Sequence, residues 1–294
     1  MGTVIEHIAL TDGGWRTRHS ALRLAVTAAK DCLHEAGRSA HDVDLLINAG
    51  IYRDRNLAEP ALAALIQEDI GANPEDPHEQ AHGTFSFDIS NGSCGVLTAL
   101  QIVDGFLKSR SIDLALVVAS DANPGHGMSE HFPFSSAGAA LLCDWSADDR
   151  GLESIHWVDI PDDGESFSAT VGLHDGRNVL RFAATEDSDE LFAEAAAQAA
   201  ETCLRKSALT LDDIDAIVAA PAHSKFRAAL SARIGCPETK IIVDDDQRTH
   251  TASLAAAFHR ASEQIRPGGR VLLVAAAAGI TAGAALYRMP DRSA

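Results

Sequence analysis

The feature that most constrains the fold is an internal repeat that extends over both halves of the chain. Residues 21–48 (ALRLAVTAAKDCLHEAGRSAHDVDLLIN) resemble residues 191–219 (LFAEAAAQAAETCLRKSALTLDDIDAIVA). Each segment is an Ala-rich helical pattern that contains Cys-Leu, followed by a short turn, Asp-x-Asp and an apolar strand. Repetition of a whole helix–strand unit predicts that the two halves fold as copies of one α/β arrangement.

A second unit is repeated as well. In the first half, Asp88 is followed by a turn, a helical pattern and the continuous apolar strand 114–119. In the second half, Asp244 is followed by a turn, the helical pattern 251–265 and the strand 270–275. The two units together account for most of the chain, so the duplication indicates the architecture of the whole protein.

The duplication predicts a layered α/β protein. We expect an N-terminal half of residues 1–150 and a C-terminal half of residues 151–294. The helical patterns that begin at Gly95 and Thr251 are largely apolar, and helices of this kind have to be buried. Five layers, in the order helix, sheet, helix, sheet, helix, would bury these two helices between two mixed sheets, with their N-termini close together.

Composition and charge exclude several classes of partner. The 294 residues include 42 Asp and Glu against 24 Lys and Arg, a formal net charge of −18, and there is no basic run. Nucleic acid and anionic membrane surfaces are therefore poor partners. There is no transmembrane-length apolar run, no signal-peptide pattern and no disulfide or zinc spacing among the five cysteines. We expect a cytoplasmic protein with reduced cysteines and no metal.

The most informative local motif is the turn between the predicted strand 85–89 and the helical pattern that begins at Gly95. Ser93 and Cys94 lie on this Gly-flanked turn. Unpaired N–H groups and the positive end of the helix dipole stabilise a developing anion there, which suits a nucleophile. In the alternative interpretation, Ser93 only caps the helix, a role that serine often has.

This motif resembles the nucleophile segment of a known family. FDISNGSCGVLTAL, followed by LALVVASD, is similar to thiolase-fold condensing enzymes, most of all the 3-oxoacyl-[acyl-carrier-protein] synthase III (ketoacyl synthase III) group. In that family a Cys nucleophile follows an Asp by five residues and precedes x-Gly. Counting from Asp88 puts Ser93 at the nucleophile position, retains Gly95 and reaches Asp121 without a gap. Cys94, one residue later, is the alternative nucleophile.

The resemblance implies that the rest of the catalytic set has changed. DIDAIVAAPAHSKFRAALSARIG aligns with the family segment D-W-L-V-P-H-Q-A-N-L-R, which puts Ala220 at the catalytic His and His223 at the later Asn. Residues 247–253 align with H-G-N-T-S-A-A-S, which puts His250 at or beside the second catalytic Asn. Cys-His-Asn has thus become Ser93, Ala220 and His250. Carbon–carbon condensation is not expected, because Ala220 removes one hydrogen-bond donor.

The changed set favours a serine mechanism. A serine hydroxyl is a poor nucleophile until a base takes its proton, and we expect His250 to be that base. His223 is a second candidate, and its alternative is an ordinary loop histidine. In a Ser-His-Asp arrangement a carboxylate orients the histidine. The expected carboxylates are Asp244, Asp245 and Asp246.

Two further segments have counterparts in the family. The sequence around Ala278 and Gly279 resembles the loop G-G-G-F-T-W-G, whose backbone N–H forms half of an oxyanion hole at the position of Ala278. Ala resists a positive φ where Gly does not, so this half of the hole depends on the backbone conformation. Lys225 and Arg233 match basic positions that touch the acyl carrier protein, with an ordinary solvated helix face as the alternative.

The segment before the first helical pattern indicates the donor. In the family, a Trp and an Arg in this segment hold coenzyme A, whereas here only residues 4–15 precede the helix. A carrier-protein-bound or other pantetheine thioester is therefore the expected substrate rather than free coenzyme A, although acyl-coenzyme A stays open as a donor. We expect no cofactor.

The resemblance leaves two hypotheses about function. In the first, the chain is an acyltransferase of fatty-acid or polyketide-type biosynthesis that forms an acyl-enzyme on Ser93 and passes the acyl group to an acceptor. In the second, it is a catalytically silent subunit that forms a heterodimer with an active ketosynthase. Both imply a dimer, homodimeric or heterodimeric, which we expect to form through the strand that follows the nucleophile helix.

Overall fold

The structure is a computed structural model that describes residues 2–73, 83–125, 127–162, 164 and 166–290. Within these ranges the strands form two five-stranded mixed sheets and one two-stranded hairpin. The first sheet has the order β1-β5-β4-β2-β3, in which β4 is parallel to β2 and antiparallel to β5. Its strands are β1 (Gly2–Asp12), β2 (Leu45–Asn48), β3 (Phe85–Asp88), β4 (Ala115–Asp121) and β5 (Ala137–Ser146).

The second sheet repeats the first strand by strand. Its order is β10-β9-β11-β12-β6, with β11 parallel to β9 and antiparallel to β12. β6, β9, β10, β11 and β12 therefore correspond to β1, β2, β3, β4 and β5, as the repeated sequence units predict. The strands are β6 (Gly151–Asp159), β9 (Ala216–Ala220), β10 (Ile241–Ile242), β11 (Arg270–Ala277) and β12 (Thr281–Arg288). The predicted halves, 1–150 and 151–294, remain a proposal about domains.

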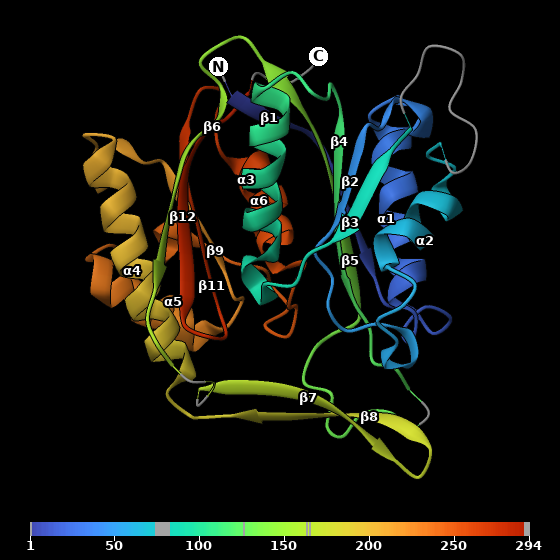
Figure 1. The fold of residues 1–294 in the computed structure, drawn as a ribbon. Coiled ribbons are helices and arrows are strands. Elements are labelled where there is room, and N and C mark those ends of the chain that lie inside the picture. Colours follow the sequence, from blue (N-terminus) through green and yellow to red (C-terminus); the bar gives the residue numbers. More distant parts are fainter. Residues whose placement is uncertain (1, 74–82, 126, 163, 165, 291–294) are drawn as a thin grey trace.

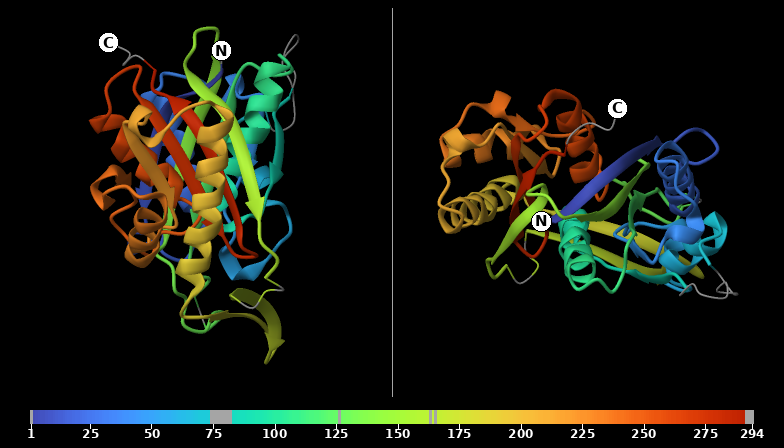
Figure 2. Two further views of the ribbon diagram at one scale, coloured as in Figure 1. Left: turned by 90° about the vertical axis from the view of Figure 1, so that its left-hand side faces the viewer. Right: turned by 90° about the horizontal axis from the view of Figure 1, so that it is seen from above.

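The α-helices form the other three layers (Figure 1). α3 and α6 lie between the sheets, α1 and α2 cover the outer face of the first sheet, and α4 and α5 cover that of the second (Figures 1 and 2). The helices are α1 (Ala21–Glu35), α2 (Leu62–Ile70), α3 (Gly95–Lys108), α4 (Ser188–Lys206), α5 (Ser224–Ile234) and α6 (Ser253–Gln264). Short 3₁₀ turns are η1 (Ala40–Asp42), η2 (Asp54–Asn56), η3 (Gly92–Cys94), η4 (Leu211–Asp213) and η5 (Glu238–Lys240). The predicted five-layer fold is confirmed.

The central layer is apolar because of the side chains of α3 and α6. Leu97 and Val103 of α3 are fully buried, in one core cluster with residues of both sheets. α6 contributes mainly small side chains to the same cluster, Ala255 and Ala257 among them. α3 is not buried on every side, since Gln101 is exposed. Within the described ranges, no helix has both the length and the apolar character that crossing a bilayer requires.

A hairpin outside the layers lies across one end of the molecule (Figure 1). It consists of β7 (Phe167–His174) and β8 (Arg177–Ala184), which pair antiparallel. The side-chain amide of Asn56 links it to the first half by donating to the carbonyl oxygens of Met128, at 2.7 Å, and Asn178, at 2.9 Å. The hairpin is therefore attached to the first half and covers the end of the molecule that it crosses.

The strand that was expected to form the dimer contact lies inside the first sheet and not at its edge. β4, the strand after the helix at the nucleophile motif, has hydrogen-bonded neighbours on both sides, and all seven of its residues are buried. A strand in this position has no free edge with which to pair. The prediction that β4 forms the dimer contact is therefore wrong, and the edge strands of the first sheet are β1 and β3.

Candidate active site

Ser93 and His250 line one cavity of about 540 Å³. Ser93 lies in η3, directly before α3, and His250 lies three residues before the start of α6. The ends of the two central helices thus meet at this cavity. Gly92, next to Ser93, has φ +50°, and a Cβ atom there would lie 3.0 Å from Ala277 Cβ and 3.7 Å from His250 Nε2. Glycine therefore allows the imidazole to approach the turn that holds Ser93.

The Ser93 hydroxyl is almost completely buried and has a specific partner. It donates a hydrogen bond to the carbonyl oxygen of Ala276, with an Oγ–O distance of 2.5 Å, and the residue is 3% exposed. Among the described residues, no backbone carbonyl accepts a hydrogen bond from the N–H of Ser93 or from that of Ala278. Both residues line the cavity, so two N–H groups are available to an oxygen atom bound there.

Asp121 orients the imidazole of His250. The distance from His250 Nδ1 to Asp121 Oδ2 is 3.2 Å, and the side chains are 12% and 3% exposed. The imidazole also stacks on Phe134, with ring centroids 4.2 Å apart. With the Nδ1–H group donating a hydrogen bond to the carboxylate, Nε2 carries the lone pair and can act as a base on the side near Gly92.

The expected carboxylates do not have this role. Asp245 pairs with Arg260. The side chain of Asp246 accepts hydrogen bonds from the Ser135 hydroxyl and the N–H of Arg248. Since Asp121 occupies the Nδ1 side of His250, the prediction that Asp244, Asp245 or Asp246 orients the ring is wrong.

Asp121 is held ionised by a set of hydrogen bonds. Its carboxylate accepts from the N–H groups of Ile51, at 3.2 Å, and Tyr52, at 2.9 Å. It also accepts from the N–H of Thr251, at 2.9 Å, and from its hydroxyl, at 2.6 Å. Burial alone would raise the pKa of Asp121, but the charge of His250 and the hydrogen bonds outweigh it and hold the pKa below its ordinary value.

Aromatic side chains form the walls around His250. Tyr52 stacks on Phe134 with ring centroids 5.1 Å apart, and Phe182 of β8 meets Tyr52 edge-on at 5.3 Å. Phe132 contacts all three rings. The hairpin therefore supplies part of the cavity wall, in which His250 is 12% exposed. Burial raises the pKa of the Tyr52 hydroxyl above its ordinary value, so this group stays protonated.

Cys94 lies away from the cavity. Its side chain is fully buried in the central core, and its Sγ is 3.7 Å from the carbonyl oxygen of Thr281. Burial raises the pKa of the thiol far above its ordinary value. A buried thiol without a thiolate form is inert. Cys94 is therefore withdrawn as an alternative nucleophile.

His223 also lines the cavity, whereas Ala220 is buried at the end of β9. The Nδ1 atom of His223 is 2.7 Å from Asp189 Oδ1, and the two side chains are 39% and 16% exposed. His223 is thus held by a carboxylate rather than loose on the surface. Among the described residues, two histidines line the cavity, each paired with its own aspartate.

The loop of Ala278 and Gly279 joins β11 to β12 at the cavity. Gly279 has φ +80° and Ile280 has φ +46°, whereas Ala278 is not among the residues with positive φ. The left-handed conformation of the turn therefore falls after Ala278, and alanine at this position is not strained.

The two expected carrier-protein contacts differ in their surroundings. Arg233 pairs with Glu190, at 3.3 Å, and with Glu194, at 3.8 Å, so its charge is largely neutralised. Lys225 is exposed on the first turn of α5, two residues after His223. Within the described ranges no carboxylate forms an ion pair with it. Of these two residues, Lys225 is therefore the one whose positive charge is not compensated by an ion pair among the described residues.

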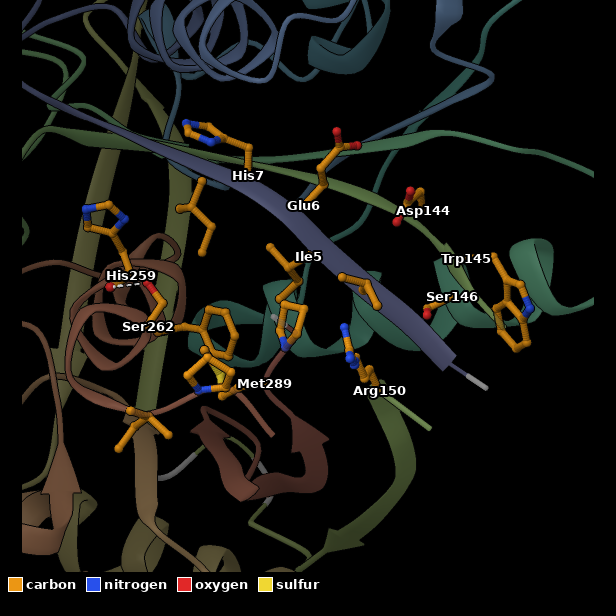
Figure 3. Close-up of a pocket in the computed structure, with 16 residues that line it drawn as sticks. Ile5, Glu6, His7, Asp144, Trp145, Ser146, Arg150, His259, Ser262 and Met289 are labelled. Atoms are coloured by element: carbon orange, nitrogen blue, oxygen red, sulfur yellow. Dashed lines mark hydrogen bonds between the residues drawn. The ribbon is translucent and has the colours of Figure 1, made fainter. Parts of the chain in front are cut away.

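A second cavity, of about 690 Å³, lies at a different place (Figure 3). It is bordered by residues of β1 and β5 and by the C-terminal part of α6, including Glu6, Asp144 and His259. Figure 3 shows that Ser262 and His259 face each other there, and the Ser262 hydroxyl donates to the His259 carbonyl at 2.6 Å. None of the predicted site residues lines this cavity, which contains no helix N-terminus, so it is not the candidate active site.

Sequence analysis did not find the roles of Asp121 and Asp189. Asp121 was visible as an acidic residue directly after a buried strand, a position at which functional groups gather in α/β proteins. Asp189 lies two residues before the helical pattern predicted from residue 191, and the structure includes it in the first turn of α4. Neither position indicates which histidine the carboxylate faces, because both contacts join segments far apart in the chain.

Comparisons with known proteins agree with the fold. The family model described as 3-Oxoacyl-[acyl-carrier-protein (ACP)] synthase III C terminal matches residues 204–289. A beta-ketoacyl-[acyl-carrier-protein] synthase III from Paramagnetospirillum magneticum is 31% identical over 310 residues, which cover 94% of this chain and 88% of the relative. The structure of 3-oxoacyl-(acyl carrier protein) synthase III from Pseudomonas aeruginosa PAO1 has a TM-score of 0.81 at 16% identity, with all of both chains covered. The priming β-ketosynthase of the R1128 polyketide pathway has a TM-score of 0.80 at 19% identity, with 99% of this chain and 97% of that one covered.

Replacing Asp121 tests the electrostatics of the site. The substitution Asp121→Asn removes the buried charge but keeps the size of the side chain, and we expect it to lower the free energy of unfolding by about 3 to 5 kcal/mol at neutral pH. Because the pKa of Asp121 is lowered in the folded state, its stabilising contribution is present above the unfolded-state pKa of about 3.9 and is lost as the pH falls through the folded-state pKa.

Urea denaturation at neutral pH and at several values below about pH 4 measures this contribution. The difference between wild type and Asp121→Asn should shrink as the pH falls. Asp175→Asn is the control, because the Asp175 side chain is 92% exposed and its replacement should change stability by less than about 0.5 kcal/mol. A difference that stays constant over the whole pH range would contradict the assignment.

Proposed function

Because the chain belongs to the 3-oxoacyl-[acyl-carrier-protein] synthase III family, a family of condensing acyltransferases, we propose that it transfers acyl groups through an ester on Ser93. The observation that supports this most is the position of His250. Its Nδ1 faces the carboxylate of Asp121 at 3.2 Å, and its Nε2 lies beside the turn that holds Ser93. A base in that position can accept the proton of a serine hydroxyl.

The acylation step follows from these contacts. The Ser93 hydroxyl turns from the Ala276 carbonyl toward His250 Nε2, which takes its proton as Oγ bonds to the thioester carbonyl carbon. The N–H groups of Ser93 and Ala278 are candidates to bind the carbonyl oxygen as it becomes negative, together with the positive end of α3. The carbon–sulfur bond then breaks, and the acyl group remains on Ser93. Ala220 lacks the donor that condensation needs, so transfer to another acceptor is favoured.

The donor we propose is a pantetheine thioester on an acyl carrier protein or coenzyme A, in fatty-acid or polyketide-type biosynthesis. The aromatic cavity of about 540 Å³ supports an acyl chain larger than acetyl, because apolar walls gain most from an apolar ligand. Lys225 supports a carrier protein as donor, since carrier proteins are acidic and its charge is uncompensated near the cavity.

A second candidate function is a silent subunit in a heterodimer with an active ketosynthase. The Ser93 hydroxyl supports it, because it is hydrogen-bonded to the Ala276 carbonyl, which is not a base. The family resemblance supports it too, because it puts Ala220 at the position of a catalytic histidine. This alternative and the acyltransferase make opposite predictions about a covalent acyl adduct.

Intact-mass measurement distinguishes the two functions. After incubation with an acyl-carrier-protein thioester, we expect the wild-type chain to gain the mass of one acyl group and Ser93→Ala to gain none, because the alanine has no hydroxyl to acylate. Cys94→Ala is the matched control and should still be acylated. An unmodified wild-type chain that copurifies with a Cys-His-Asn ketosynthase would favour the silent subunit instead.

The role of Lys225 is tested with two donors. Lys225→Glu should raise KM for the carrier-protein thioester about 5- to 10-fold, as the loss of roughly 1 kcal/mol in an exposed charge contact implies. It should leave KM for a short pantetheine thioester unchanged, because that donor has no acidic surface. Lys30→Glu, an exposed lysine on α1, serves as the control. Equal effects on both donors would exclude carrier docking at Lys225.

We propose that a dimer forms through the edge strand β3 rather than β4. Phe85 on β3 is 57% exposed, and its ring lies 5.3 Å from that of Phe87. Pairing two such edges would continue the first sheet into a second subunit and cover these rings. Light scattering should therefore show a dimer for wild type and for Leu173→Arg, on the exposed hairpin, but a monomer for Phe85→Arg. If Phe85→Arg still forms a dimer as stable as that of the wild type, the interface is not at β3.

A further inference from the structure

A second histidine–aspartate pair faces the same cavity as Ser93. His223 precedes α5, and its Nδ1 lies 2.7 Å from Asp189 Oδ1 in the first turn of α4. α4 begins directly after the hairpin, at the end of the molecule that the hairpin covers (Figure 1). With the Nδ1–H group donating a hydrogen bond to the carboxylate, the lone pair of His223 is on Nε2, which points away from Asp189. The second pair thus presents a base, as the first pair does.

The two pairs differ in their access to solvent. The side chain of His250 is 12% exposed, whereas that of His223 is 39% exposed. Gln247 and Arg248 also line the cavity, where the Gln247 side chain accepts from the N–H of Ser224 at 3.3 Å and the Arg248 side chain is 70% exposed. His250 is therefore the more enclosed of the two histidines, and His223 is the one that is more accessible from solvent, from which a second substrate arrives.

With a thioester donor, the transfer step needs a second base, because His250 is still protonated after acylation. When His250 takes the Ser93 proton, the leaving thiol of pantetheine, with an ordinary thiol pKa of about 8.5, can depart as a thiolate without receiving that proton. The protonated imidazole is then stabilised by the buried carboxylate of Asp121. A protonated His250 can return the proton to Ser93, but it cannot take one from an incoming acceptor.

We propose, on the basis of the acyl-Ser93 function above, that His223 is the general base that activates a hydroxyl acceptor, an alcohol or water, for attack on the acyl-Ser93 ester. His223 Nε2 takes the hydroxyl proton while the acceptor oxygen bonds to the ester carbonyl carbon. The bond from that carbon to Ser93 Oγ then breaks, and Oγ receives the proton that His250 holds. The product is an ester or a free acid, and His223 releases its proton to solvent. Asp189 is a positioning residue.

The presence of a second base indicates which chemical class of acceptor the site uses. A hydroxyl attacks an ester slowly unless its proton is removed, whereas hydroxylamine is nucleophilic in its neutral form. An active site with a dedicated second base that is accessible from solvent therefore favours hydroxyl acceptors. Hydroxylamine supplies a probe that reaches the same acyl-enzyme without requiring His223.

Single-turnover kinetics separate acylation from transfer. The probes are the full-length chain, the N-acetylcysteamine thioester of hexanoic acid as donor, and water, 1-propanol or hydroxylamine as acceptor. We expect His223→Gln to form the acyl-enzyme at the wild-type rate and to lose it to water and propanol about 100-fold more slowly, the lower range for a general base. Loss to hydroxylamine should be unchanged. Asp189→Asn should show the same selective loss, to a smaller extent.

The matched control is a histidine–aspartate pair outside the cavity. His174 and Asp175 lie at the end of the hairpin, 3.6 Å apart, with side chains that are 65% and 92% exposed, and His174→Gln should behave as wild type. Two results would overturn the second-base role while the acyl-Ser93 function stands. In one, His223→Gln transfers the acyl group to propanol at the wild-type rate. In the other, the substitution slows the reaction with hydroxylamine as much as the reaction with propanol. If wild type forms no acyl-enzyme at all, both proposals are overturned.

Discussion

The structure of the site depends on one buried carboxylate. Asp121 ends a central strand of the first sheet, and it accepts hydrogen bonds both from the loop at Ile51 and Tyr52 and from Thr251 and His250 in the second half. Without these donors, the charge would be too costly to bury. The carboxylate therefore fixes the start of α6 against the first sheet, and the orientation of His250 is a consequence of how the two halves are joined.

The repeated units, together with the family resemblance of the nucleophile motif, predicted the fold, because two copies of a strand–helix unit can bury their apolar helices in few ways. The placement of Ser93 and His250 at one cavity also follows from the duplication, since corresponding helix ends meet between corresponding sheets. The partner of His250 could not be predicted in this way. Asp244, Asp245 and Asp246 are close to it in sequence, but Asp245 and Asp246 point to Arg260 and Ser135 instead.

The dimer strand was predicted wrongly because the apolar run 114–119 is typical of a central strand and not of an edge strand. The run 114–119 is continuously apolar, and such a run indicates a strand that is covered on both faces and paired on both sides. The structure shows this for β4, all of whose residues are buried. β3, with the sequence FSFD, alternates apolar and polar residues instead, and it exposes Phe85. The same apolar pattern that predicted a buried strand was therefore evidence against an interface there, because an edge strand has to leave one row of backbone groups unpaired.

In the proposed mechanism His250 and His223 act as bases, whereas condensation needs two hydrogen-bond donors to the thioester carbonyl oxygen. Each has its Nδ1 turned to a carboxylate, so each offers the lone pair of Nε2 to the cavity and no N–H while it is neutral. A neutral imidazole held in this way removes protons rather than polarising a carbonyl oxygen. Ala220, at the position that the family resemblance assigns to the catalytic histidine, has no side-chain donor. The site is thus suited to moving two protons, one from Ser93 and one from an acceptor, and this favours transfer of an acyl group to oxygen over formation of a carbon–carbon bond.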